Sequence, residues 1–107
     1  MDSRIRKAID FMGENLNRKL TEKNLASING LTPQHFCVLF KAQSAETPMR
    51  YLRTLRLERA REFLNTPENS NRSIKEIAAL VGYDFSHFVR DFEKRFGQSP
   101  ARYRASK

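Results

Sequence analysis

The side chains of this sequence that could do chemistry are mostly basic. Lysine and arginine together number 20 against 12 aspartates and glutamates, which gives a formal net charge of +8 at pH 7. These basic residues are spread over the whole length. The positive electrostatic potential that they produce favours a polyanionic partner, with nucleic acid ahead of a membrane surface. Ordinary surface solubility is the alternative, because a charge of this size is unremarkable for a small domain.

Residues of the kinds used in catalytic and metal sites are few. The two histidines, His35 and His87, stand in separate segments without a cluster of carboxylates or thiolates beside them, so we expect no metal ion and no cofactor. The sequence offers no Ser/His/Asp set, no pair of carboxylates on an apolar face and no phosphate-binding glycine loop. We therefore expect no enzymatic activity.

The single cysteine and the apolar stretches bear on the cellular compartment. Cys37 cannot form an intrachain disulfide, which favours a reducing environment. Nothing adjacent to it except helix polarity would lower its pKa, so we expect a small, partly buried residue instead of a redox sensor. Neither a signal peptide nor a membrane span is predicted, because the N-terminus is charged and the longest strongly apolar stretch is IAALV at 77–81. The cytoplasm is the expected location.

The sequence matches itself at an offset of 52 residues, and the matched residues keep their physical roles. In each copy a hydroxyl residue precedes a short apolar pattern, a glycine follows it, and two phenylalanines then recur at helical spacing. The chain is long enough for one compact domain, or for two very small ones that share a helix. The matched pairs are Thr21/Ser73, Leu25/Ile77, Ala26/Ala78, Gly30/Gly82, Thr32/Asp84, His35/His87, Phe36/Phe88, Phe40/Phe92, Thr47/Ser99, Pro48/Pro100, Arg50/Arg102 and Tyr51/Tyr103.

Each copy is predicted to form a short helix, a tight turn and a longer helix. The short helices cover about 21–28 and about 73–80, and each ends at its glycine. The longer helices, of roughly a dozen residues each, begin after the capping residues Thr32 and Asp84. This order is the helix-turn-helix arrangement, in which the first helix supports the second and the second enters a major groove of DNA.

Further helices complete an all-α chain with no predicted sheet. An opening helix over about 4–16 supplies an apolar face to the first copy. A helix of about 18 residues, from Pro48 to Asn65, spans roughly 27 Å and is expected to act as a strut, so that both copies reach successive major grooves about 34 Å apart. The polar residues 66–72 are predicted to be a loop. The expected divisions are a first subdomain over 1–46, a linker helix over 47–65 and a second subdomain over 66–107.

Two long segments carry a resemblance to a known family. The stretch IAALVGYDFSHFVRDFEKRFGQSPARYR resembles the signature half of the AraC/XylS-type transcription regulators, and GLTPQHFCVLFKAQSAETPMRYLRTLRLERAREFL resembles the preceding half. The specific features are the turn glycine, the paired phenylalanines, Gly97, the Ser-Pro and the Tyr-Arg, in that order. The resemblance covers nearly the whole chain. It implies about seven helices, two helix-turn-helix subdomains joined by a long helix, and insertion of a monomer into adjacent major grooves with some bending of the DNA.

The resemblance also implies which side chains face the bases. In the second copy, Arg90 is one of the residues implied to face the bases. Its guanidinium can bind guanine O6 and N7 together, a contact worth about 1–3 kcal/mol of discrimination between base pairs. An arginine that contacts only phosphate or solvent is the alternative. In the first copy Val38 replaces the arginine that family members commonly have, so base reading there would rest on a thymine methyl, with Gln34 available for adenine. The implied base-contacting residues are Gln34, Cys37 and Val38 in the first copy, and Ser86, Val89 and Arg90 in the second.

A second departure from the family lies at the end of the first recognition helix. Ala45 stands where a glycine commonly closes this helix, as Gly97 does in the second copy. We expect the helix terminus at Ala45 to be tighter or slightly strained, because residues with a Cβ resist a positive φ.

Contacts to DNA phosphates are expected from basic residues near helix starts and groove edges, and from the first-turn amides at two capping residues. For each lysine, an ordinary solvated position is an equal alternative. The expected phosphate-contacting residues are Thr21, Lys23, Lys41, Arg72, Ser73, Lys75 and Lys94.

The sequence thus favours sequence-specific binding of double-stranded DNA by a bacterial transcription regulator. A helical protein-interaction module that docks on polymerase or on a partner subunit is the alternative, and RNA polymerase stays open as an additional partner. RNA binding is weaker, since the aromatic residues fall on inward helix faces instead of on an exposed stacking platform. We expect the isolated chain to be monomeric.

Overall fold

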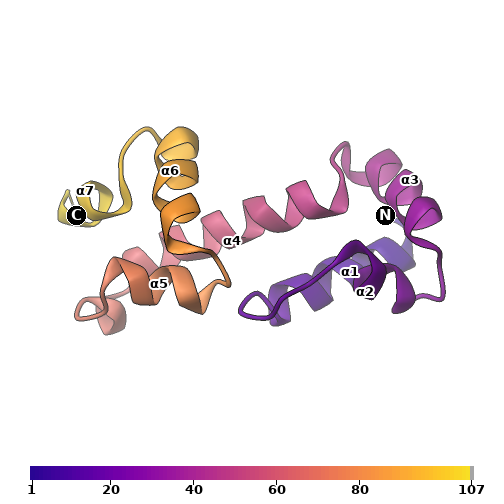
Figure 1. The fold of residues 1–107 in the computed structure, drawn as a ribbon, viewed down its shortest axis with the longest axis horizontal. Coiled ribbons are helices and arrows are strands. Elements are labelled where there is room, and N and C mark those ends of the chain that lie inside the picture. The colour runs from indigo at the N-terminus through magenta and orange to yellow at the C-terminus, as the bar shows by residue number, and fades with distance from the viewer. Residues whose placement is uncertain (107) are drawn as a thin grey trace. The chain divides into compact units, whose positions relative to one another are not determined.

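The computed structural model describes residues 1–106, which form seven α-helices, one short 3-10 helix and no strand (Figure 1). The predicted all-α fold is confirmed. No helix within 1–106 is both long enough and apolar enough to cross a lipid bilayer. The elements are α1 (Ser3–Glu14), α2 (Glu22–Ser27), α3 (Pro33–Ser44), α4 (Pro48–Leu64), the 3-10 helix η1 (Pro67–Asn69), α5 (Ile74–Leu80), α6 (Phe85–Phe96) and α7 (Pro100–Ala105).

The chain divides into two compact units. The first unit is Met1–Thr54 and the second begins at Leu55, so α4 gives its first half to one unit and its second half to the other. Each unit contains one copy of the sequence repeat. The division predicted from the sequence, with a separate linker over 47–65, remains a prediction.

The core of the first unit is built from the apolar stripes of four helices. Side chains from α1, α2, α3 and the start of α4 are inaccessible to solvent, as the helical spacing of these residues predicts. α1 is shorter than expected and ends at Glu14, because the Asn15 side chain bonds the Phe11 carbonyl oxygen at 2.9 Å and the backbone leaves the helix there. The fully buried residues of this unit include Ile5, Ala8, Met12, Leu25, Ala26, Phe36, Phe40 and Leu52.

The core of the second unit has the same design. Apolar residues from the second half of α4 pack with one face of α5 and one face of α6. Five half-buried residues surround this cluster, four of them aromatic, so the second core is richer in ring contacts than the first. The buried residues are Leu57, Ala60, Leu64, Ile77, Ala78, Val81, Phe88 and Phe92.

The helix starts repeat at the same offset as the sequence. The Thr21 hydroxyl accepts a hydrogen bond from the Asn24 amide at 3.1 Å, and the Ser73 hydroxyl accepts one from the Glu76 amide at 3.0 Å. Glu76 also accepts a bond from the Ser73 amide at 2.9 Å, which completes a capping box and lowers the pKa of the Glu76 carboxyl. Local chemistry therefore fixes where both short helices begin.

The ends of α3 and α6 share a left-handed residue. Gly97 has φ +82° and its amide bonds the Glu93 carbonyl oxygen at 2.8 Å, while Ala45 has φ +67° and bonds the Lys41 carbonyl oxygen at 2.8 Å. Ala45 is the one residue other than glycine with positive φ in the part of the chain described. The expected strain at this terminus is confirmed, because the Cβ of an alanine crowds the following carbonyl in this conformation.

These two termini predict opposite effects of exchanging alanine and glycine. Ala45→Gly should raise the free energy of unfolding by about 0.5–1 kcal/mol, since relief of about 1–2 kcal/mol of left-handed strain exceeds the added chain entropy of glycine. Gly97→Ala is the matched control and should lower it by a similar amount; a Cβ there would meet no atom within 4 Å, so only the backbone conformation changes. Thermal unfolding of both variants measures this, and a lower melting temperature for Ala45→Gly would contradict the assignment.

Candidate nucleic-acid interface

Both copies of the repeat form the predicted helix-turn-helix arrangement. In the first turn Gly30 has φ +66°, and the Leu31 amide donates to the Ala26 carbonyl oxygen at 3.1 Å. In the second turn Gly82 has φ +72°, and the Tyr83 amide donates to the Ala78 carbonyl oxygen at 2.9 Å. The longer helix that follows, α3 or α6, has 12 residues in each copy.

Buried phenylalanines fix which face of α6 is turned outward. Phe88 and Phe92 are fully buried, with ring centroids 5.6 Å apart, and Phe92 also meets the rings of Phe96 at 4.6 Å and Tyr103 at 5.7 Å. Phe36 and Phe40 hold α3 in the same way, also at 5.6 Å. With one face of the helix anchored in the core, the opposite face is turned to solvent, and Arg90 in α6 and Val38 in α3 are the exposed residues between these rings.

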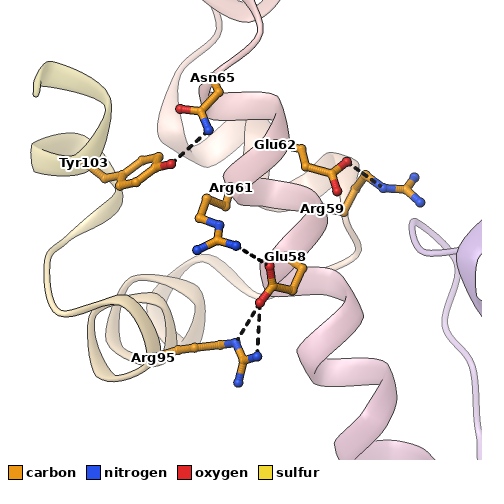
Figure 2. A network of polar contacts seen from close by, with 7 residues as sticks. All are labelled: Glu58, Arg59, Arg61, Glu62, Asn65, Arg95 and Tyr103. Atoms are coloured by element: carbon orange, nitrogen blue, oxygen red, sulfur yellow. Dashed lines mark hydrogen bonds and ion pairs between the residues drawn. The ribbon is translucent and has the colours of Figure 1, made fainter. Parts of the chain in front are cut away.

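A polar network ties α6 and α7 to the second half of α4 (Figure 2). One Glu58 carboxylate oxygen bonds Arg95 of α6 at 3.1 Å, and the other bonds Arg61 one turn further along α4 at 2.7 Å. Beyond the end of α4, the Asn65 amide group donates to the Tyr103 hydroxyl of α7 at 2.9 Å. These contacts hold α6 against its support, and the sequence analysis did not predict them.

The residues of the second copy that are expected to contact bases lie together on the outward face of α6. Ser86, Val89, Arg90, Glu93 and Lys94 line one shallow depression along this helix. The Arg90 side chain is 70% exposed, and its Nε lies 3.5 Å from the nearer carboxylate oxygen of the next residue. The base-contacting residues expected in the second copy and one of the expected phosphate contacts therefore share a single exposed surface.

The first turn of α6 has its own hydrogen-bond cluster. Asp84 Oδ1 accepts a bond from the Ser86 hydroxyl at 2.7 Å and one from the His87 amide at 3.3 Å. Both bonds hold the pKa of the Asp84 carboxyl below its usual value, and the bond from the Ser86 hydroxyl has the larger effect. The Ser86 proton is therefore directed back to the helix start, which leaves the hydroxyl oxygen as an acceptor for a partner outside the protein.

The outward face of α3 is less polar. Gln34 is exposed and the Val38 side chain is 70% exposed, whereas Cys37 is half-buried and donates its thiol proton to Glu22 Oε2 at 2.7 Å. Burial, together with the bond to Glu22, raises the pKa of Cys37 to about 11. The expectation of a partly buried residue is confirmed, and its thiol proton is engaged by Glu22 of α2 instead of being offered outward.

The residues expected to contact phosphate are all exposed. Lys23 of α2 and Lys75 of α5 occupy matching positions of the repeat, one residue inside each short helix. Arg72 Nε is engaged by the Asn69 side chain at 2.9 Å. The Ser73 amide already donates to a carboxylate within the capping box, so a phosphate at that helix start would have to replace this bond. The remaining members of the set are Thr21, Lys41 and Lys94.

Comparison with known proteins agrees with this geometry. A family model described as "Helix-turn-helix domain" matches residues 25–106. The chain is 34% identical over 98 residues to the XylDLEGF operon transcriptional activator of Pseudomonas putida, covering 89% of this chain but 30% of that activator. Among solved structures, the C-terminal domain of AraT, a response regulator from Geobacillus stearothermophilus, superimposes with a TM-score of 0.87 at 28% identity, covering 99% of this chain and 87% of that one. The DNA-binding domain of AdpA has the same fold, with a TM-score of 0.89 at 24% identity and coverage of 98% and 93%.

The fold and its exposed helix faces define a DNA-binding protein of the helix-turn-helix class. More specifically, the chain belongs to the AraC/XylS-type family of transcription regulators.

The Cys37–Glu22 contact predicts a thiol that reacts slowly. Because Cys37 is the single cysteine, its reaction with a thiolate-specific disulfide reagent can be followed against pH without interference. We expect an apparent pKa near 11 in the folded chain and a value of about 8.5 in denaturant. Glu22→Gln should lower the folded value, since the carboxylate that disfavours the thiolate is removed, whereas Glu14→Gln on α1 should not. Equal reaction rates for folded and unfolded protein at pH 8 would contradict this.

Proposed function

We propose that this chain binds double-stranded DNA sequence-specifically as the DNA-binding part of a bacterial transcription regulator, with α3 and α6 entering adjacent major grooves. The observation that carries the proposal is the outward face of α6, where Ser86, Arg90 and Lys94 are exposed while Phe88 and Phe92 of the same helix are buried. An exposed helix of this length fits a major groove, where every base pair shows a distinct pattern of donors and acceptors.

We assign base reading mainly to the second copy. Arg90 would donate two hydrogen bonds to guanine O6 and N7, the commonest specific contact in major grooves. Val89 would pack on a thymine methyl, and Ser86 would accept a hydrogen bond from an exocyclic amino group because its own proton is held by Asp84.

The first copy would read its groove more weakly. Val38 offers an apolar surface for a thymine methyl and Gln34 can pair with adenine N6 and N7. Cys37 would contribute only its sulfur surface, since its proton is bound by Glu22. We therefore expect the two halves of the target site to differ in how strictly their sequence is required.

The regulatory role is proposed from the relatives. The Pseudomonas putida protein named above is a transcriptional activator, which supports an activating role for a regulator that contains this chain. We further propose that the chain acts in the cytoplasm and catalyses no reaction. When isolated it would bind DNA as a monomer. RNA polymerase bound to the same DNA would be an additional partner. The chain spans 30% of that activator's length.

Selection of bound sequences from random duplexes, at a stated salt concentration, tests the proposed function. We expect a preferred motif of about 15–20 base pairs, as two adjacent major grooves require. Arg90→Ala should abolish the preference at one guanine, with a loss of about 1–3 kcal/mol of discrimination. Arg90→Lys is the matched control for charge and should relax the same position while keeping more of the overall affinity. If no motif emerges, or if Arg90→Ala retains full preference, base reading by Arg90 is wrong.

Removing phosphate contacts should act on all sequences alike. Lys23→Gln and Lys75→Gln remove the same charge from matching positions of α2 and α5, and each should reduce the slope of log K against log salt by about 0.9. Lys7→Gln on α1, which lies outside the predicted contact set, should leave the slope unchanged. Binding isotherms at four or more salt concentrations on specific and random duplexes measure this. A change in sequence preference instead of in slope would contradict the assignment of Lys23 and Lys75.

A further inference from the structure

Asp91 is an acidic residue on the helix that we propose enters DNA, and its two carboxylate oxygens face different partners. Oδ2 accepts a hydrogen bond from the Tyr83 hydroxyl at 2.6 Å, and Oδ1 lies 3.5 Å from Arg90 Nε. The Asp91 side chain is 23% exposed, against 70% for Arg90. A partly buried carboxylate thus stands between the core and the exposed guanidinium.

Tyr83 holds this carboxylate from a rigid position. It follows the glycine turn, its amide closes that turn, and its ring packs edge-on against Phe88 with centroids 5.6 Å apart. A hydroxyl that donates to a carboxylate at this distance makes a charge-assisted bond, among the stronger hydrogen bonds in proteins. The direction of the Asp91 carboxylate is therefore set by the core and not by solvent.

The contact to Arg90 suits the recognition of guanine. A guanidinium has five N–H donors in a fixed fork, and a carboxylate near Nε leaves the two terminal nitrogens, Nη1 and Nη2, available to another acceptor. These are the donors needed for O6 and N7 of one guanine. At 3.5 Å the contact is an ion pair longer than a usual hydrogen bond in the free chain, so we expect it to shorten when DNA orders the side chain.

The first copy of the repeat shows that the fold does not need this pair. Leu31 and Leu39 occupy the positions of Tyr83 and Asp91, and Val38 occupies the position of Arg90. The turn and the longer helix are nevertheless the same in both copies, with equivalent caps and phenylalanine spacing. Tyrosine and aspartate are thus present where the exposed arginine is present and are both replaced by leucine where it is absent.

Electrostatics alone would count against an acidic residue here. A carboxylate on a surface that meets phosphates repels them and lowers affinity for every sequence. The contribution of Asp91 to DNA binding must then be something other than an increase in overall affinity.

We propose that Asp91 is a positioning residue for base recognition: held by Tyr83, it aligns the Arg90 guanidinium so that both terminal nitrogens meet one guanine. Alignment before binding reduces the side-chain entropy lost in the complex and penalises the other base pairs, which cannot accept both bonds. This inference rests on the proposed function, since it concerns how strictly Arg90 reads its base pair.

The test compares discrimination with overall affinity. Dissociation constants are measured for the selected duplex, for duplexes changed at the base pair that depends on Arg90, and for a random duplex. Asp91→Asn should reduce discrimination at that base pair at least about fivefold, the lower end of what such a contact provides, while affinity for the random duplex rises. Tyr83→Phe should have a smaller effect at the same base pair. Glu62→Gln, which removes an equal charge from an exposed position of α4 outside this surface, should leave discrimination unchanged.

A double-mutant cycle separates positioning from a general effect on the helix. With Arg90→Ala as background, Asp91→Asn should change discrimination no further. If Asp91→Asn does not fold, the variant Tyr83→Leu/Asp91→Leu, which copies the residues of the first unit, takes its place.

Three results would overturn the inference. Unchanged discrimination in Asp91→Asn, while Arg90→Ala relaxes it, would leave the proposed function standing and remove the positioning role. An effect of Asp91→Asn that persists without Arg90 would assign Asp91 to helix stability alone. No effect of Arg90→Ala on sequence preference would remove base reading by Arg90, and with it the role of Asp91.

Discussion

The burial of paired phenylalanines is the interaction on which the interface depends. Phe88 and Phe92 in one unit, and Phe36 and Phe40 in the other, are fully buried on one side of their helix. Removal of such large side chains from water is among the largest favourable terms in a unit this small. Because the rings are four residues apart, their burial sets both the position of the helix and its rotation about its own axis. Every statement about an outward-facing residue of α3 or α6 follows from that rotation.

The two units use one backbone plan with different polar chemistry. The second unit adds the Glu58 network to α4, a complete capping box and the Tyr83–Asp91 bond. At the matching places the first unit has Arg6 and Gln43, a single cap at Thr21, and two leucines. Exposed ion pairs contribute little to stability, and the first unit adopts the same plan without them. Their role is better understood as fixing the orientation of side chains on a helix that must present them accurately.

Most of the fold could be predicted from the sequence because its signals are local. Caps, positive-φ glycines and phenylalanine spacing each act within a few residues, so the order of the helices and the two turns were predicted. Boundaries were less accurate: Thr21 precedes α2 instead of beginning it, because a capping residue has extended backbone, and α1 ends before Leu16 although Leu16 is still buried.

The contacts that hold the site together could not be predicted in the same way. Glu58 and Arg95 are 37 residues apart, and the sequence offers many other acidic and basic residues with which each could pair. The Glu22–Cys37 and Tyr83–Asp91 bonds likewise depend on how one helix lies against its neighbour. The sequence indicated which surface of α6 is exposed, but the partners that orient its side chains come from tertiary packing.

The repeated helix starts and turns have a consequence for how such a chain can change over evolutionary time. Stability is supplied by inward residues and caps, whereas the outward positions of α3 and α6 differ between the copies without altering the backbone that carries them. Substitutions at those outward positions meet little resistance from folding. A lineage of such proteins can therefore drift to new operators one base pair at a time, with each half of the operator diverging independently of the other.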